Sequence, residues 1–307
     1  MATLSRAQFE KAQAFLQARG RRLDIARFAY QFEGSSKEAV LGELAAYQNS
    51  DGGFKGEMEG DFLLPAASPM ATTIGFQLFR ELHLQADHPI VQRGISYLLT
   101  SFDEDRGYWL PVPPEVNEHP HAPWWHYTEG KDDEAPDFAP NPSAEIVGYL
   151  HQYGGDLCSV DWLRELTSRA LKRLQAEPDA MDMHAFLCYL RMAEALSEHE
   201  RSVAMAKLRA SLPHVVNTDP QSWGGYGAKP LYFVSSPDSP LADLITGPVA
   251  ENLDYEIRAQ EEEGCWSPTW SWGQYEEAWQ AARIRIQSAL TVGTLLRLHH
   301  FGRIESM

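Results

Sequence analysis

The stretch Gln48-Asn-Ser-Asp-Gly52-Gly-Phe54 has a form that recurs along the chain: glutamine, three residues, glycine, one residue and an aromatic ring. It recurs complete at 260–266, and without the glutamine at 103–109 and 220–226. Each copy follows a stretch with helical periodicity. A glycine permits the chain reversal that ends a helix, and a glutamine amide can hydrogen-bond neighbouring backbone. The repeat therefore predicts helices joined by similar turns, with the ring packed on the helix end.

These motifs resemble the Gln-Trp repeat of the triterpene cyclases and the related repeat of protein prenyltransferase β subunits. Those families share an α/α toroid, a closed ring of helical hairpins with inner and outer helices around a central cavity. The resemblance extends over roughly residues 35–300. It implies an all-α fold, with one toroid domain of about six hairpins spanning residues 1–307. It also implies a small-molecule ligand, such as an isoprenoid, in the central cavity.

Helix signals along the chain support the all-α prediction. Ser5-x-x-Gln8 has the form of a capping box. Three further helix starts place an N-cap residue before a proline, at Ser68-Pro69, Asn141-Pro142 and Ser239-Pro240. The segments after the first two, 70–79 and 146–150, are apolar nearly all round, which predicts helices buried on both sides. Amphipathic helices are expected at 35–48, 89–100, 159–176, 198–216 and 274–298, for roughly twelve helices in all.

Composition excludes several classes of protein. The 307 residues carry a net charge of −17, which disfavours nucleic acid as a partner. No apolar run is long enough to span a membrane, and the first residues lack the apolar region of a secretory signal. Three cysteines without a Cys-x-x-Cys pair indicate a reducing compartment. We therefore expect a cytoplasmic protein, without a cofactor or a bound metal.

Four segments follow the repeated motifs and are expected to meet at one mouth of the ring: 55–68, 110–141, 227–240 and 267–275. Acidic residues are concentrated in the first two, with three against one Lys in 55–68 and seven against one Lys in 110–141. The segment 110–141 also holds seven prolines and an aromatic cluster. A loop of this length in a compact domain is usually functional or disordered, and the aromatic cluster favours order. We interpret it as a lid, and an irregular rim is the alternative.

Four carboxylates are the candidate catalytic residues. Glu145 and Asp243 each lie three residues beyond the proline of a predicted helix start. Burial there raises a carboxyl pKa and can create a general acid, although a first-turn acid can simply complement the helix dipole. Glu59 and Asp61 lie in an acidic cluster before a predicted inner helix, where a solvated rim is the alternative.

Aromatic residues in the mouth segments are the candidate ligand-binding residues. They are Trp124, Trp125, His126, Tyr226, Trp270 and Trp272. Aromatic faces stabilise carbocations and stack on sugar rings, and packing of the rim is the alternative. The histidines 119, 121 and 126 with Asp132 and Asp133 could bind a divalent metal, but their spacing fits no standard ligand pattern. The run 132–137 only faintly resembles the aspartate-rich motif of terpene synthases.

The chain also departs from the families that it resembles. The Asp-x-Asp-Asp motif of squalene-type cyclases is absent, and Cys158, Cys188 and Cys265 do not match the zinc pattern of the prenyltransferases. The paired Cys and Cys-His of the lanthionine cyclases are missing as well. No activity can therefore be transferred residue by residue.

Three functions remain open at this point. The first is an enzyme acting on an apolar ligand by carboxylic-acid catalysis. The second is a non-catalytic toroid that binds a ligand or partner. The third is a carbohydrate-active enzyme with paired carboxylates, for which a separation of about 5–10 Å is expected. The side chains that line the ring interior would distinguish them.

Overall fold

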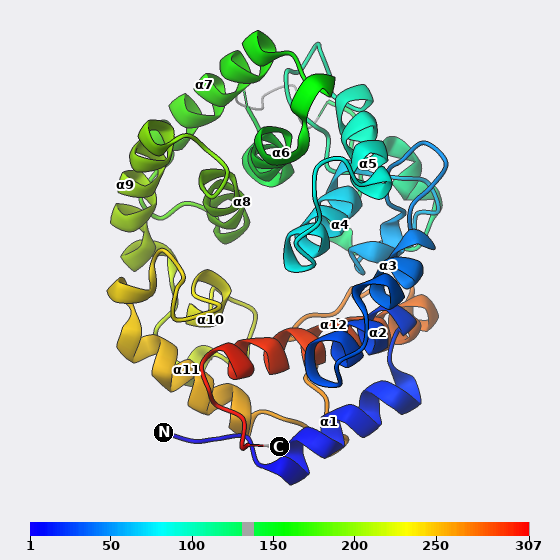
Figure 1. Cartoon of the computed structure of the whole chain (residues 1–307), viewed down its shortest axis with the longest axis vertical. Helices are drawn as coiled ribbons and strands as arrows, with labels where there is room; N and C mark the ends of the chain where they lie inside the picture. The colour runs from blue at the N-terminus through cyan, green and yellow to red at the C-terminus, as the bar shows by residue number, and fades with distance from the viewer. Residues whose placement is uncertain (131–137, 307) are drawn as a thin grey trace. The chain divides into compact units, whose positions relative to one another are not determined.

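The computed structural model describes residues 1–130 and 138–306. These residues form twelve α-helices and several short 3₁₀ turns (Figure 1). Isolated β-bridges pair single residues of the connecting segments. The all-α prediction is confirmed for this part of the chain. Its residues cluster into two compact units, 45–215 and a second made of 1–44 with 216–307. No helix among the described residues is long and apolar enough to cross a membrane.

The unit 45–215 contains six of the helices. α6 packs against α8, α5 and α4, and α9 packs against both α7 and α8. Most residues of both α4 and α6 are buried, as their apolar sequences predict. The helices are α4 (Pro69–Glu81), α5 (Pro89–Thr100), α6 (Pro140–Tyr153), α7 (Val160–Ala176), α8 (Met183–Ala193) and α9 (Glu198–Val215), with 3₁₀ turns η1 (Gly56–Met58), η2 (Pro114–Glu118), η3 (Pro123–Trp125) and η4 (Gly155–Leu157).

The other unit is built from both ends of the chain, which lie close together (Figure 1). Leu4 pairs with Ile304 in a parallel bridge, and the Leu4 N–H donates to the carbonyl of Arg303 at 2.8 Å. α12 packs on α1 and α2. The helices are α1 (Arg6–Arg19), α2 (Arg22–Phe32), α3 (Lys37–Ala45), α10 (Pro230–Phe233), α11 (Thr246–Arg258) and α12 (Glu276–His300), with 3₁₀ turns η5 (Pro220–Ser222) and η6 (Ala242–Leu244).

The repeated turn has the predicted hydrogen bonds in both complete copies. The Gln48 amide donates across the turn to the Gly52 carbonyl and to Ile90 on α5, both at 2.9 Å. Gln260 donates in the same way to Gly264, and to the Gln8 carbonyl on α1. Gly52 and Gly264 both have a φ of +94°, a conformation that side chains rarely adopt. The glutamine therefore joins the turn to a neighbouring helix.

A hydroxyl group on a later helix completes three copies of the turn. The backbone N–H of each motif's aromatic residue donates to that hydroxyl. The three pairs are Phe54 with Thr72 on α4 at 3.0 Å, Trp109 with Ser143 on α6 at 3.1 Å, and Trp266 with Thr291 on α12 at 3.3 Å. This shared contact shows that the three turns are one structural device.

The fourth copy of the motif, 220–226, differs from this pattern. Its predicted aromatic residue, Tyr226, is 60% exposed. The buried ring is Trp223 instead, which is 1% exposed and donates from its indole to the Asn217 carbonyl at 2.9 Å. The glycine spacing alone therefore predicted the wrong ring, because a larger aromatic residue nearby fills the core.

The predicted helix start at Ser239-Pro240 is wrong. The Ser239 hydroxyl accepts the N–H of Ser236 at 3.0 Å, and so it closes a turn instead of capping a helix. The next regular helix, α11, begins at Thr246. By contrast, the Ser5 capping box and the Ser68 cap are present as predicted.

Candidate functional site

Glu59 and Asp61 lie in a tight turn directly after η1. The backbone N–H of Asp61 donates to the Glu59 carboxylate at 2.8 Å. Gly60 between them has a φ of +107°, so a residue without a side chain permits this reversal. Asp61 is buried, and Glu59 keeps part of its surface exposed. Two carboxyl groups are thus held together in one short turn, which we call the acidic turn (59–61).

A second loop pairs with the acidic turn along the backbone. The Ala122 N–H donates to the Asp61 carbonyl, and the Leu63 N–H donates to the carbonyl of Pro120, both at 2.8 Å. The rings of Phe62 and Trp125 meet edge to face with their centroids 5.7 Å apart. Within unit 45–215, the two predicted mouth segments therefore do meet. They bring Glu59 and Asp61 beside the loop that carries Trp125 and His126.

Two histidines of this loop form a hydrogen-bonded chain. His121 Nδ1 lies 2.6 Å from the carbonyl of His119, and its Nε2 lies 3.1 Å from Nδ1 of His126. A carbonyl can only accept, so in neutral rings His121 Nδ1 carries a proton and its Nε2 accepts from His126. This assignment leaves Nε2 of His126 as an acceptor. Because His126 is exposed, that acceptor is accessible to a solute.

The surroundings of Glu59 change its acidity. Burial, and then the negative charge of Asp61, raise the pKa of Glu59 from 4.5 to about 8. The Asp61 N–H and the nearby Trp125 indole oppose this shift, although that indole N–H lacks the geometry of a full hydrogen bond. At neutral pH, Glu59 is therefore mainly protonated and can donate a proton, while His126 can accept one.

Glu145 lies elsewhere, in the buried contact between α4, α6 and α8. Its carboxylate accepts from Tyr149 at 3.1 Å and from Gln77 at 3.2 Å, and it pairs with Arg191 at 3.3 Å. Burial works against the charged form of Arg191, but Glu145 outweighs it and raises the Arg191 pKa. Burial and then Glu145 raise the pKa of Cys188. In these contacts, Glu145 forms a structural ion pair with Arg191. The predicted role of Glu145 as a proton donor stays a prediction.

Asp243 does not occupy the position expected for it. It lies in η6, before α11 begins, and its side chain is exposed. The expected equivalence with Glu145 depended on the helix start at Ser239-Pro240, which is absent. The structure therefore places one of these two carboxylates in the core of its unit and the other at the surface.

The remaining aromatic candidates have different environments. Trp124, on η3, is 48% exposed. Trp272 is buried and packs on Trp279 with their centroids 5.5 Å apart, so it belongs to the core. Tyr226 and Trp270 meet edge to face at 6.0 Å. The predicted ligand-binding residues thus include exposed, half-buried and fully buried rings.

Trp270 lines a pocket of about 280 Å³ in the unit that contains 216–307. Lys229 pairs with Glu256 at 3.1 Å in its wall, and the Lys229 ammonium lies over the Tyr255 ring. We call this the aromatic pocket; its rings are Tyr232, Tyr255, Trp266 and Trp270. An aromatic wall with a few charged groups is typical of small-molecule sites.

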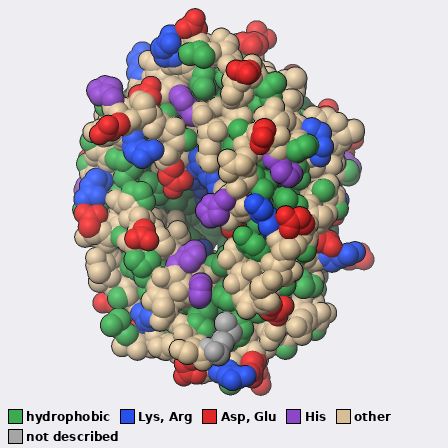
Figure 2. Space-filling view, in the orientation of Figure 1, with side chains coloured by type: hydrophobic (Ala, Val, Ile, Leu, Met, Phe, Trp, Pro, Cys, Tyr) green, Lys and Arg blue, Asp and Glu red, His purple; other side chains and the backbone are tan. Residues whose placement is uncertain are grey.

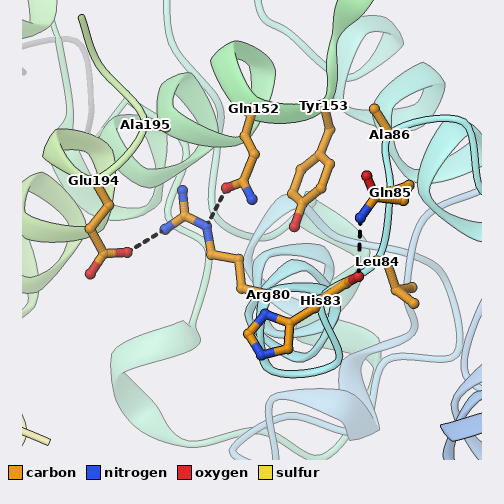
Figure 3. A pocket seen from close by; sticks show the side chains of 9 residues that line it. All are labelled: Arg80, His83, Leu84, Gln85, Ala86, Gln152, Tyr153, Glu194 and Ala195. Carbon is orange, nitrogen blue, oxygen red and sulfur yellow. Dashed lines mark hydrogen bonds and ion pairs between the residues drawn. The ribbon is translucent and has the colours of Figure 1, made fainter. Parts of the chain in front are cut away.

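A larger pocket, of about 640 Å³, lies in unit 45–215 where α4, α6 and α8 end (Figure 3). We call it the helix-end pocket; it is lined by Arg80, His83, Leu84, Gln85, Ala86, Gln152, Tyr153, Glu194 and Ala195. Sequence reasoning missed it because its residues come from three helices that are distant along the chain. Arg80 at the end of an otherwise apolar segment was the one signal that could have indicated it.

The described residues do not form a metal site around His119, His121 and His126. His121 uses its two ring nitrogens toward His119 and His126, and no group of three His, Cys, Asp or Glu side chains in 1–130 and 138–306 is placed to hold an ion. Asp132, Asp133 and the acidic run 132–137 lie outside the described residues.

On the face shown in Figure 2, acidic and basic side chains are interspersed.

Comparison with protein-family models, with curated proteins and with solved structures found no match to this chain. The resemblance of the repeat to the cyclases and prenyltransferases therefore remains a prediction from the motifs. The function has to be inferred from the side chains themselves.

Proposed function

We propose that this protein is an enzyme that protonates an apolar, isoprenoid-like ligand from the carboxyl group of Glu59. The observation that carries the proposal is the meeting of two carboxyl groups with a histidine chain and aromatic rings. The acidic turn supplies Glu59 and Asp61, and the loop paired with it supplies Trp125 and His126. The raised pKa of Glu59 supports its role as the acid.

Each group has a distinct part in this reaction. Glu59 donates its proton to a double bond of the ligand, and the Asp61 charge favours the protonated form of Glu59 beforehand. The faces of Trp124 and Trp125 stabilise the cation that forms. The free nitrogen of His126 then accepts a proton from the ligand. Proton donation and removal together rearrange double bonds or close rings, and the ligand neither gains nor loses protons overall. The exposed His126 then releases its proton to solvent, and Glu59 regains one from solvent.

The proposal includes the ring architecture implied by the repeat. Two complete turns make the same glutamine contacts, and three share the hydroxyl contact to a later helix. Repetition of one helix–turn device is what a toroid of helical hairpins requires. In this proposal the ligand lies in the central cavity.

The test compares Glu59→Gln with a matched control, Glu57→Gln. Glu57 is a neighbouring acid that pairs with Lys55 at 3.5 Å and lies outside the acidic turn. Protein is incubated with squalene and with geranylgeraniol, and the extracted products are analysed by mass spectrometry. We expect turnover to fall about 10²–10⁴-fold in Glu59→Gln and to be unchanged in Glu57→Gln. Equal turnover in both variants would exclude Glu59 as the acid.

The aromatic pocket favours a second candidate, a protein that binds a ligand without transforming it. Its rings and its buried Lys229–Glu256 pair are independent of the acidic turn. In that case, Trp270→Ala abolishes ligand capture, whereas Glu59→Gln leaves capture intact and no product appears with any variant. Recovery of chemically unchanged ligand from the wild-type protein would support binding alone.

A further inference from the structure

We propose that the helix-end pocket binds a small neutral molecule rich in hydroxyl groups, of the size of a monosaccharide. The pocket shares no residue with the acidic turn or with the aromatic pocket. The proposal is therefore independent of the proton-transfer reaction. It rests on a buried hydroxyl, an anchored arginine and the charge balance of the pocket.

Tyr153 has a buried hydroxyl that points into this pocket. The side chain is 2% exposed, and its oxygen has no hydrogen bond among the described residues. Gln152 lies near it without the geometry of a hydrogen bond, although it is close enough to affect the Tyr153 pKa. In Figure 3 the hydroxyl is turned toward the middle of the pocket. Buried hydroxyls nearly always have a partner, so this one fits a polar group of a ligand.

Arg80 is held rigidly at the side of the pocket. Its Nε donates to the Gln152 amide oxygen at 2.7 Å, and its Nη1 donates to Glu194 at 2.9 Å and to the Arg191 carbonyl at 3.0 Å. Its guanidinium also lies over the Tyr149 ring. The other terminal nitrogen, Nη2, is buried and has no partner among the described residues. The arginine is therefore fixed in place before any ligand arrives.

The charges around the pocket favour a neutral ligand. Glu194 balances Arg80, so neither a cation nor an anion gains a free counter-charge there. The C-terminal ends of α4, α6 and α8 add partial negative charge, which disfavours an anion further. An apolar ligand would leave the Tyr153 hydroxyl without a partner, at a cost in free energy. A neutral molecule with several hydroxyl groups satisfies all of these conditions.

The shape of the pocket suits such a ligand. Its volume of about 640 Å³ lies within the range of small-molecule sites. Tyr153 and Leu84 are buried, whereas His83, Gln85 and Gln152 are exposed. Buried and exposed lining residues together provide a floor that a ligand can contact and a rim by which it can enter.

The experiment is calorimetric titration of the full chain with a matched set of sugars. D-Glucose, D-galactose and D-mannose are the neutral probes, D-glucuronate is the anionic probe and D-glucosamine the cationic one. We expect at least one neutral hexose to bind at least ten-fold more tightly than either charged sugar. Tyr153→Phe and Gln152→Ala should each weaken that binding at least ten-fold.

The control is Trp270→Ala, which changes the aromatic pocket and should leave hexose binding unchanged. Circular dichroism shows whether each variant is folded. If Tyr153→Phe does not fold, Gln152→Ala still tests the pocket, because the Gln152 side chain is exposed. Three results would overturn the proposal: no binding of any neutral hexose, tighter binding of glucuronate or glucosamine, or a loss of binding in Trp270→Ala alone.

Discussion

At the scale of single residues, Glu59 makes the stability of the protein depend on pH. Its pKa is about 8 in the folded protein, compared with an ordinary 4.5. Protonated Glu59 makes its full contribution to the free energy of unfolding below pH 4.5. This contribution is lost as the pH rises from 4.5 through 8. The loss is about 1.4 kcal/mol for each pH unit between the two pKa values. The Glu59→Gln variant lacks this loss. The difference between its free energy of unfolding and that of the wild type should therefore increase from pH 5 to pH 8.

Urea denaturation at these two pH values measures the effect on the free energy of unfolding. Glu57→Gln is again the control, because Glu57 lies outside the turn that brings Glu59 and Asp61 together. A stability difference between Glu59→Gln and wild type that is the same at pH 5 and pH 8 would contradict the assigned pKa.

The candidate residues differ in how far their environment could be predicted from sequence. Acidic and aromatic residues in two successive mouth segments indicated a shared location, and Glu59, Asp61 and Trp125 do share one. The sequence could not show that Glu145 has an arginine partner. Arg191 lies on a different helix, and its contact arises only when α6 packs on α8.

At the scale of secondary-structure elements, Gly52 is the residue that closes the first repeated turn. A Cβ atom there would lie 2.2 Å from the Arg93 carbonyl oxygen, in addition to the strain of a φ of +94°. Gly34 is a matched control, since its φ is +70° and nothing lies within 4 Å of an added Cβ. We expect Gly34→Ala to cost about 1–2 kcal/mol, from backbone strain alone. Gly52→Ala should cost at least about 1 kcal/mol more, because backbone atoms must also move.

Thermal or urea unfolding of the two glycine variants provides the comparison. Similar destabilisation in both would mean that the close approach of the turn to α5 is unimportant. At the equivalent position in the second complete copy, a Cβ atom added to Gly264 would lie 2.4 Å from the Lys11 carbonyl oxygen, so Gly264→Ala should behave as Gly52→Ala does.

Local signals predicted helices well where the capping group had no competing partner. Ser68 caps α4 as expected, because its hydroxyl accepts the N–H of Ala71. Ser239 has the same sequence context but binds Ser236, so no helix starts there. The helix-end pocket could not be predicted from the sequence for a related reason. It depends on where three helices end in space, which no local pattern encodes.

At the scale of the whole molecule, the division into two units predicts that one of them can be loosened selectively. Arg303 joins the ends of the chain within the unit 1–44 with 216–307: its side chain bonds the Ala2 carbonyl and pairs with Asp254, and its backbone carbonyl accepts from Leu4. Burial would raise the pKa of Asp254, but the Ala2 N–H and Arg303 together lower it. Arg303→Ala should therefore destabilise this unit by about 3 kcal/mol.

Hydrogen–deuterium exchange followed by mass spectrometry measures this effect along the chain. Peptides from α1, α11 and α12 should exchange faster in Arg303→Ala, whereas those from α6 and α8 should keep their wild-type rates, because residues 45–215 have a buried core of their own. Arg6→Ala is a suitable control, since the Arg6 side chain forms an exposed ion pair with Glu10. Faster exchange of equal size in both units would mean that the chain unfolds as one cooperative body. The selective effect is expected because each unit packs its own helices around separate buried side chains.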